Sequence, residues 1–119
     1  MTLTFRAETE AVDDGVGAVT VAGELDQATL PELQRALDEV IESGSGALVV
    51  DLSDCSFIDS SGLAALVSAR ERVSAGVGRG FAICCGSPQV LRLLEITGLD
   101  KAMDVVATRD EALEAVRAA

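Results

Sequence analysis

Hydrophobic and polar residues alternate in the first part of the chain. Leu3, Phe5 and Ala7 alternate with polar neighbours, and a second apolar stretch covers residues 18–22. Alternation of this kind is typical of strands with one buried face. Residues 13–15 (Asp-Asp-Gly) between the two stretches are typical of a turn, so the pattern predicts a β-hairpin.

Apolar residues then recur at helical spacing in four places, which predicts four helices. A capping box is expected at the start of the first helix (Thr29 with Glu32) and of the last (Thr108 with Glu111). The third is expected to begin at Ser87-Pro88, because proline is tolerated in a first turn. The expected ends of the first three helices are marked by glycine: Ser43-Gly44, the glycines of residues 76–80, and Gly98.

Short apolar runs between the helices predict further strands. Residues 47–52 form a continuous run, as expected for a strand buried on both faces, and a loop through Cys55, Phe57 and Ile58 follows it. Residues 81–85 and 103–107 predict two more strands. Strands that alternate with helices require crossover connections and a largely parallel sheet. The sequence therefore predicts one α/β domain over residues 1–119, with a mostly parallel mixed sheet, an N-terminal antiparallel hairpin and about four covering helices.

The composition limits the classes of function that the sequence allows. The 119 residues are 49% hydrophobic, enough for one core, and 20 acidic against 9 basic residues give a net charge of −11. Such a surface repels nucleic acid and anionic lipid, although the acidity is also consistent with a role in solubility alone. We expect neither nucleic acid nor a membrane as partner. The N-terminus lacks a signal-peptide pattern, and three cysteines without disulfide or zinc spacing predict buried free thiols, so a cytoplasmic location is expected.

The reactive residue types exclude several kinds of enzyme. No histidine is present, which rules out Ser-His-Asp and Cys-His catalysis, and no P-loop motif occurs. We expect no catalytic residues, no cofactor and no metal. One open alternative is a magnesium or phosphoacceptor-aspartate site formed by Asp26, Asp51, Asp54 and Asp59. Helix capping or solvent exposure is the favoured interpretation of these aspartates.

The segment Asp59-Ser60-Ser61-Gly62 joins a predicted strand to a predicted helix. Plain helix capping explains the segment, but two successive serines exceed what one cap requires, so one hydroxyl can face outward. Free amide groups and the helix dipole at this position favour an attached phosphate. Gly62 is expected to let another surface approach the backbone.

These residues also carry a family resemblance. The sequences Leu48-Val49-Val50-Asp51-Leu52 and Phe57-Ile58-Asp59-Ser60-Ser61-Gly62-Leu63 resemble the signature of the STAS-domain family, specifically the bacterial anti-sigma factor antagonists. The segments Gly23-Glu24-Leu25-Asp26, Ser87-Pro88 and Thr97-Gly98-Leu99 are similar to that family too. The similarity extends in register over nearly the whole chain.

The resemblance implies a regulatory cycle and no enzymatic activity. An unphosphorylated antagonist binds an anti-sigma factor that is also a serine kinase, which frees the sigma factor. The kinase then phosphorylates the serine after the motif aspartate, here Ser60, and a serine phosphatase reverses this. Asp26, Asp59, Ser61 and Gly62 match positions near the contact surface. The alternatives are a STAS scaffold without a switch, in a stress-signalling or transporter complex, and a small-molecule binder or hydrolase.

Overall fold

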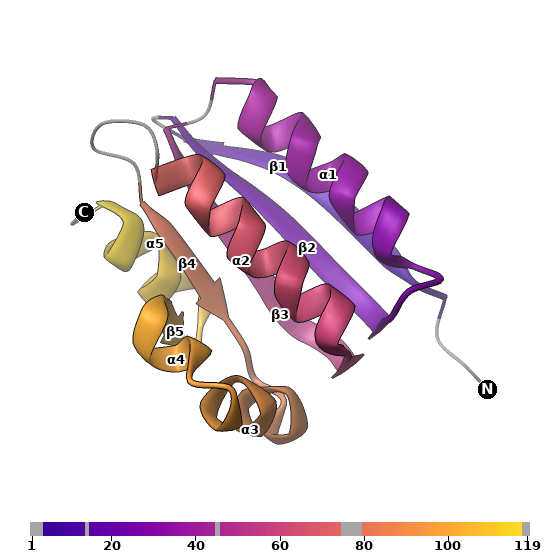
Figure 1. Cartoon of the computed structure of the whole chain (residues 1–119). Coiled ribbons are helices and arrows are strands. Elements are labelled where there is room, and N and C mark those ends of the chain that lie inside the picture. Colours follow the sequence, from indigo (N-terminus) through magenta and orange to yellow (C-terminus); the bar gives the residue numbers. More distant parts are fainter. Residues whose placement is uncertain (1–3, 14, 45, 75–79, 118–119) are drawn as a thin grey trace.

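One five-stranded mixed sheet with helices on both faces forms the domain (Figure 1). The computed structural model describes residues 4–13, 15–44, 46–74 and 80–117. The spatial order of the strands is β1-β2-β3-β4-β5, with β1 antiparallel to β2 and all other neighbours parallel. The predicted α/β class and the N-terminal hairpin are confirmed. The strands are β1 (Arg6–Asp13), β2 (Val16–Leu25), β3 (Ala47–Ile58), β4 (Phe81–Cys84) and β5 (Asp104–Val106).

Five helices are present in the described residues, one more than the four that the spacing predicts. They are α1 (Leu30–Glu42), α2 (Ser60–Ser74), α3 (Pro88–Ile96), α4 (Leu99–Ala102) and α5 (Arg109–Arg117). The extra helix arises because Gly98, at φ 78°, ends α3 but is followed at once by another helical turn. The predicted glycine-rich end of α2 falls on residues 76 and 78, outside the described residues. None of the helices in the described part of the chain is both long and apolar enough to span a bilayer.

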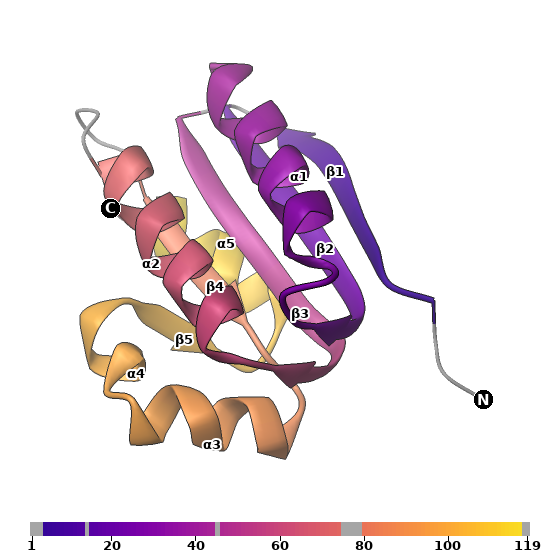
Figure 2. The same ribbon diagram turned by 45° about the vertical axis from the view of Figure 1, so that its right-hand side comes forward.

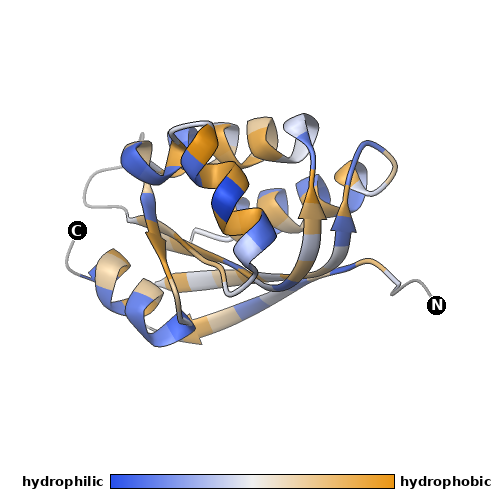
Figure 3. Ribbon diagram, turned by 90° about the horizontal axis from the view of Figure 1, so that it is seen from below, coloured by the Kyte–Doolittle hydropathy of each residue, from blue (hydrophilic) through white to orange (hydrophobic). Residues whose placement is uncertain are grey.

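The sheet separates two apolar clusters. The larger packs the sheet against α1 and α2, which lie side by side, and includes Leu33, Leu66 and Leu94. The smaller lies beneath α5 and includes Ala112 and Val116. Figure 3 shows α5, next to the C-terminus, on one side of the sheet and the other helices opposite it. Each crossover helix thus buries its apolar stripe on one side of a sheet that is apolar on both.

All three cysteines are free and buried, as predicted. Cys84 belongs to the smaller cluster and Cys85 to the larger, so the two neighbours point to opposite faces of the sheet. Burial, followed by the nearby charge of Asp51, raises the pKa of the Cys84 thiol to about 12. These thiols contribute to packing.

The strand β3 is longer than predicted. The expected loop at Cys55, Phe57 and Ile58 is wrong, because the strand continues to Ile58 and pairs there with Leu25 of β2. Two irregularities in the register between β2 and β3 shift the side-chain alternation, so that Cys55 and Ile58 are buried while Phe57 is 48% exposed. This extension carries the strand directly to the start of α2.

The predicted helix starts are partly corrected. Thr108 caps α5 as expected, because its hydroxyl accepts a 3.2 Å hydrogen bond from the Glu111 backbone N–H. The Glu111 carboxylate accepts a 3.1 Å bond from the Thr108 hydroxyl, in place of the backbone N–H of a full capping box. Ser87 and Pro88 begin α3 as expected, although the Ser87 side chain makes no capping bond. The Thr29–Glu32 box is wrong, because the Thr29 side chain turns back toward Asp26 and makes no bond to the helix amides.

Candidate functional site

Two strands end side by side where the predicted site lies. Leu25 of β2 and Ile58 of β3 are paired neighbours, and the next residues in the chain are Asp26 and Asp59. The Asp59 backbone N–H donates a hydrogen bond of 3.1 Å to the Leu25 carbonyl, which extends the pairing by one residue. Both carboxylates therefore leave the sheet at the same edge, at the carboxyl ends of parallel strands.

Asp59 is the residue that caps α2. One carboxylate oxygen, Oδ1, accepts a 2.6 Å hydrogen bond from the Ser61 hydroxyl and a 3.0 Å bond from the Gly62 backbone N–H. The Ser61 hydroxyl, and then the Gly62 N–H, lower the pKa of Asp59 below its ordinary value of 3.8. A carboxylate that accepts these bonds stays ionised at neutral pH and satisfies a helix amide that would otherwise lack a partner.

The two serines divide two tasks between them. Ser61 is half-buried, and its hydroxyl is committed to Asp59. Ser60, the first residue of α2, is exposed, and no hydrogen bond of its hydroxyl is found within the described residues. The predicted excess hydroxyl is therefore Ser60. It stands at a helix N-terminus, where amide donors and the helix dipole favour negative charge.

A second tight turn holds Asp26 beside this cap. Its Oδ1 accepts hydrogen bonds from the backbone N–H groups of Ala28, at 3.0 Å, and Thr29, at 3.1 Å. In return, the Asp26 backbone N–H donates to the Thr29 hydroxyl at 2.9 Å. This reciprocal pair fixes the connection from β2 to α1. The Gln27 backbone N–H of the same turn also helps to lower the pKa of Asp59, so the turn lies near the cap.

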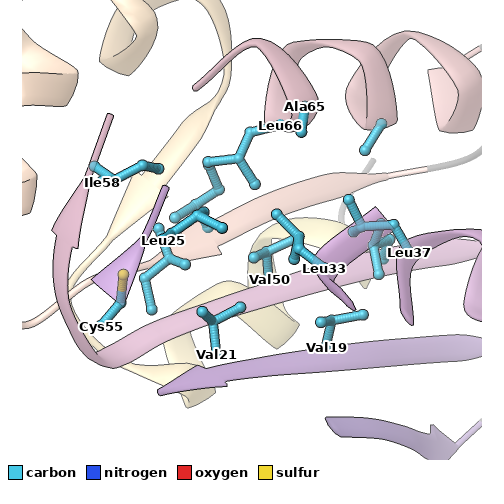
Figure 4. Packing of buried hydrophobic residues seen from close by; sticks show 14 of the residues in the cluster. Val19, Val21, Leu25, Leu33, Leu37, Val50, Cys55, Ile58, Ala65 and Leu66 are labelled. Carbon is cyan, nitrogen blue, oxygen red and sulfur yellow. The ribbon is translucent and has the colours of Figure 1, made fainter. Parts of the chain in front are cut away.

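Packing inside the domain explains why residue 62 is a glycine. A Cβ atom at this position would lie 2.8 Å from Cγ1 of Ile58 and 2.8 Å from both Cγ and Cδ2 of Leu25. Figure 4 shows Leu25 and Ile58 among the buried side chains between the sheet and α2. The surface that approaches Gly62 is therefore the domain's own core, and the expected approach of another surface from outside is wrong.

The four aspartates do not gather into a metal site. No group of three or more His, Cys, Asp and Glu residues is arranged to hold a metal ion in the part of the chain that the structure describes. Asp51 accepts a 2.9 Å bond from the Ser53 backbone and lies 3.5 Å from the Arg109 guanidinium. Burial alone would raise the pKa of Asp51, but hydrogen bonds from Ser53 and Cys84, together with the Arg109 charge, outweigh burial and lower that pKa. Asp26 and Asp59 serve as caps, so the capping interpretation accounts for both.

An apolar groove beside the cap was not predicted. It has a volume of about 340 Å³ and lies between the end of β3 and α3, with Phe57, Ile58, Leu93 and Ile96 in its walls. Phe57 was expected in a loop, and Ile96 lies at the end of α3, off the face that is buried. The available signal was Ile96 itself, which is out of step with the buried Val90 and Leu94.

The fold and this strand-to-helix site together define a known class of domain. The STAS domain family matches residues 9–112, and the chain belongs to that family. An anti-sigma-F factor antagonist, RsfB, from Mycobacterium tuberculosis is 33% identical over 109 residues, which is 92% of this chain and 88% of that protein.

Solved structures agree. The crystal structure of an anti-sigma factor antagonist from Mycobacterium paratuberculosis superposes with a TM-score of 0.88 at 38% identity, covering 96% of this chain and 95% of that one. The anti-sigma factor antagonist SpoIIAA in its unphosphorylated form gives a TM-score of 0.77 at 25% identity, covering 96% and 98% of the two chains. The resemblance stated from the sequence is thus confirmed.

Proposed function

We propose that this protein is an anti-sigma factor antagonist whose association with its partner is switched by phosphorylation of Ser60. The unphosphorylated form binds an anti-sigma factor that is also a serine kinase, and the sigma factor is released. The observation that carries this proposal is the division of tasks between the serines, because Asp59 and Ser61 complete the cap and leave the Ser60 hydroxyl exposed.

The chemistry requires little from this chain. The Ser60 oxygen attacks the γ-phosphorus of ATP held by the kinase, a bond from Oγ to phosphorus forms, and the bond to the bridging oxygen breaks. ADP leaves, and the serine proton passes to a base on the kinase. A serine phosphatase reverses the modification by directing water at phosphorus, which restores the hydroxyl and releases inorganic phosphate. The domain acts as a substrate and a regulator, so it needs no histidine, metal or cofactor of its own.

Charge explains how the modification weakens binding. A phosphate at Ser60 adds about −1.5 to −2 charge at neutral pH, next to the ionised Asp59 and close to the Asp26 turn. The partner surface that fits the neutral hydroxyl then faces concentrated negative charge. Binding is weakened because the phosphate must be desolvated and because it repels any negative charge on the partner. A mismatch of about 3 kcal/mol corresponds to roughly a hundredfold loss of affinity. Asp26, Asp59 and Ser61 border this proposed contact, whereas Gly62 is buried and belongs to the packing of α2 on the core.

We propose a cytoplasmic location for the protein, because ATP, the kinase and the sigma factor meet there. Its test is phosphorylation of the purified chain by a candidate kinase with ATP, read by intact mass and by fragmentation that locates the phosphate. One phosphoryl group on Ser60 is expected. Ser60→Ala should abolish it, and Ser61→Ala is the matched control, since it removes the neighbouring hydroxyl but leaves the acceptor.

Binding of the kinase without phosphorylation of Ser60 would replace the switch with the scaffold alternative. Absence of both binding and phosphorylation with every cognate kinase would overturn the proposed function as a whole.

A further inference from the structure

The groove beside α2 concentrates the exposed apolar surface of the domain. Phe57 is 48% exposed and Ile96 is 68% exposed, and within the described residues these are the large hydrophobic side chains that remain exposed. Both line the same groove, with Ile58, Val90 and Leu93. Isolated exposed hydrophobics are ordinary, but two that share an apolar groove mark an interaction surface.

The groove is continuous with the position of Ser60. Ile58 is in its wall, and a single residue, Asp59, separates Ile58 from Ser60, so the two positions are at most about 7 Å apart along the chain. Figure 2 shows α3 directly below the start of α2 and close to the end of β3. A stable interface covers about 800 Å² on each partner, a patch about 16 Å in radius. A kinase that closes its active site over Ser60 therefore also covers the groove.

We infer that this groove binds an apolar side chain of the serine kinase. This contact contributes to the affinity of the complex, whereas phosphorylation of Ser60 controls when the complex dissociates. The inference rests on the proposed function. The expected occupant is an aliphatic or aromatic side chain on the kinase, flanked by a carboxylate. The carboxylate is chosen for charge complementarity, because Arg92 is exposed at the groove and makes no ion pair within the described residues.

The two contacts have separable consequences. The groove lies outside the reacting atoms, so an apolar contact there stabilises the ground state and the transition state of phosphoryl transfer equally. Loss of such uniform binding raises KM and leaves kcat unchanged. The Ser60 hydroxyl, in contrast, is the acceptor itself.

The experiment compares Phe57→Ser and Ile96→Ser with the unchanged protein as substrates of the kinase that phosphorylates Ser60. Each variant should raise KM, and the Kd of the unphosphorylated complex, about tenfold or more at unchanged kcat. Arg92→Glu should also weaken binding, by repulsion. Leu113→Ala on α5, on the opposite face of the sheet, is the control for loss of an apolar side chain elsewhere. Urea unfolding confirms that each variant is folded.

Two results would overturn the inference. Unchanged KM and Kd for both serine variants, with Ser60 still phosphorylated, would reject the groove and leave the proposed function intact. If the unchanged protein is a dimer in solution that Ile96→Ser dissociates without altering kinase binding, the occupant is a second copy of this chain. Failure of the unchanged protein to bind or be phosphorylated would instead reject the proposed function, and the inference with it.

Discussion

Replacing Gly62 by alanine tests the internal packing of the site. Alanine normally stabilises a helix relative to glycine, by about 0.4–1 kcal/mol, and Gly62 does not have the positive φ that would exclude a side chain. Here, however, the new Cβ would lie 2.8 Å from Ile58 and from Leu25. Both neighbours are fully packed, at 2% and 0% exposure, so neither side chain has free space to move into.

The two effects oppose each other, and overpacking is the larger. Forcing a methyl group into a close-packed core costs about 1–3 kcal/mol. Subtracting a helix gain of about 0.7 kcal/mol from a central cost of about 2 kcal/mol leaves a net loss of about 1.3 kcal/mol for Gly62→Ala. Valine adds two further methyl groups at the same place and should cost more.

Urea unfolding followed by circular dichroism measures this difference. The matched control is Gly86→Ala, because a Cβ at Gly86 has no atom within 4 Å and the backbone there does not have a positive φ. That variant should be as stable as the unchanged protein or slightly more so. Leu25→Ala removes two of the three atoms that clash, so Gly62→Ala should cost less in that background. Equal or greater stability of Gly62→Ala than of Gly86→Ala would refute the internal explanation for this glycine.

Three further outcomes follow from the site and the core. Ser60→Ala should bind the kinase about as well as the unmodified protein and resist switching, whereas Ser60→Asp should bind about tenfold or more weakly by calorimetry; equal affinities would contradict the switch. Asp59 has a lowered folded-state pKa, so its stabilisation is present above pH 3.8 and is lost as the pH falls through the folded value. Urea unfolding should therefore show that Asp59→Asn is less stable than the unchanged protein at pH 7, and that this difference in stability is smaller at acid pH. A difference that does not change with pH would reject the charged cap. Cys84, with its pKa raised to about 12, should resist iodoacetamide at pH 8 until urea unfolds the chain, and rapid labelling of the native protein would disprove that burial.

The sequence predicted the order of the elements well because the buried runs are continuous and the breaks between them are strong. It failed where polar residues interrupt a strand. Ser53, Asp54 and Ser56 make the second half of β3 look like a loop, and only pairing with β2, across irregular register, shows that it is a strand. That pairing depends on residues about thirty positions away, which local patterns do not include.

The capping residues also show that local sequence patterns do not identify which contacts form. Both Asp26 with Thr29 and Thr29 with Glu32 have the spacing of a capping pair, and only the first pair forms. The prediction that one of the two serine hydroxyls faces outward was confirmed. Only the structure shows which one it is, because Asp59 is the cap and the Ser61 hydroxyl binds it. Gly62 was assigned the wrong neighbour, because Leu25 approaches it from another strand.

The cap also separates the switch from folding. Asp59 supplies the bonds that start α2, and the Ser60 hydroxyl supplies none within the described residues, so esterification of that hydroxyl breaks no contact that holds the helix. A phosphate at the helix N-terminus is favoured by the helix dipole and opposed by Asp59, and these effects partly cancel. We expect phosphorylated and unphosphorylated protein to differ by less than about 1 kcal/mol in unfolding free energy, measured in urea on material checked by intact mass. A large loss of stability on phosphorylation would mean that the modification acts by unfolding α2, and docking charge would no longer explain the switch.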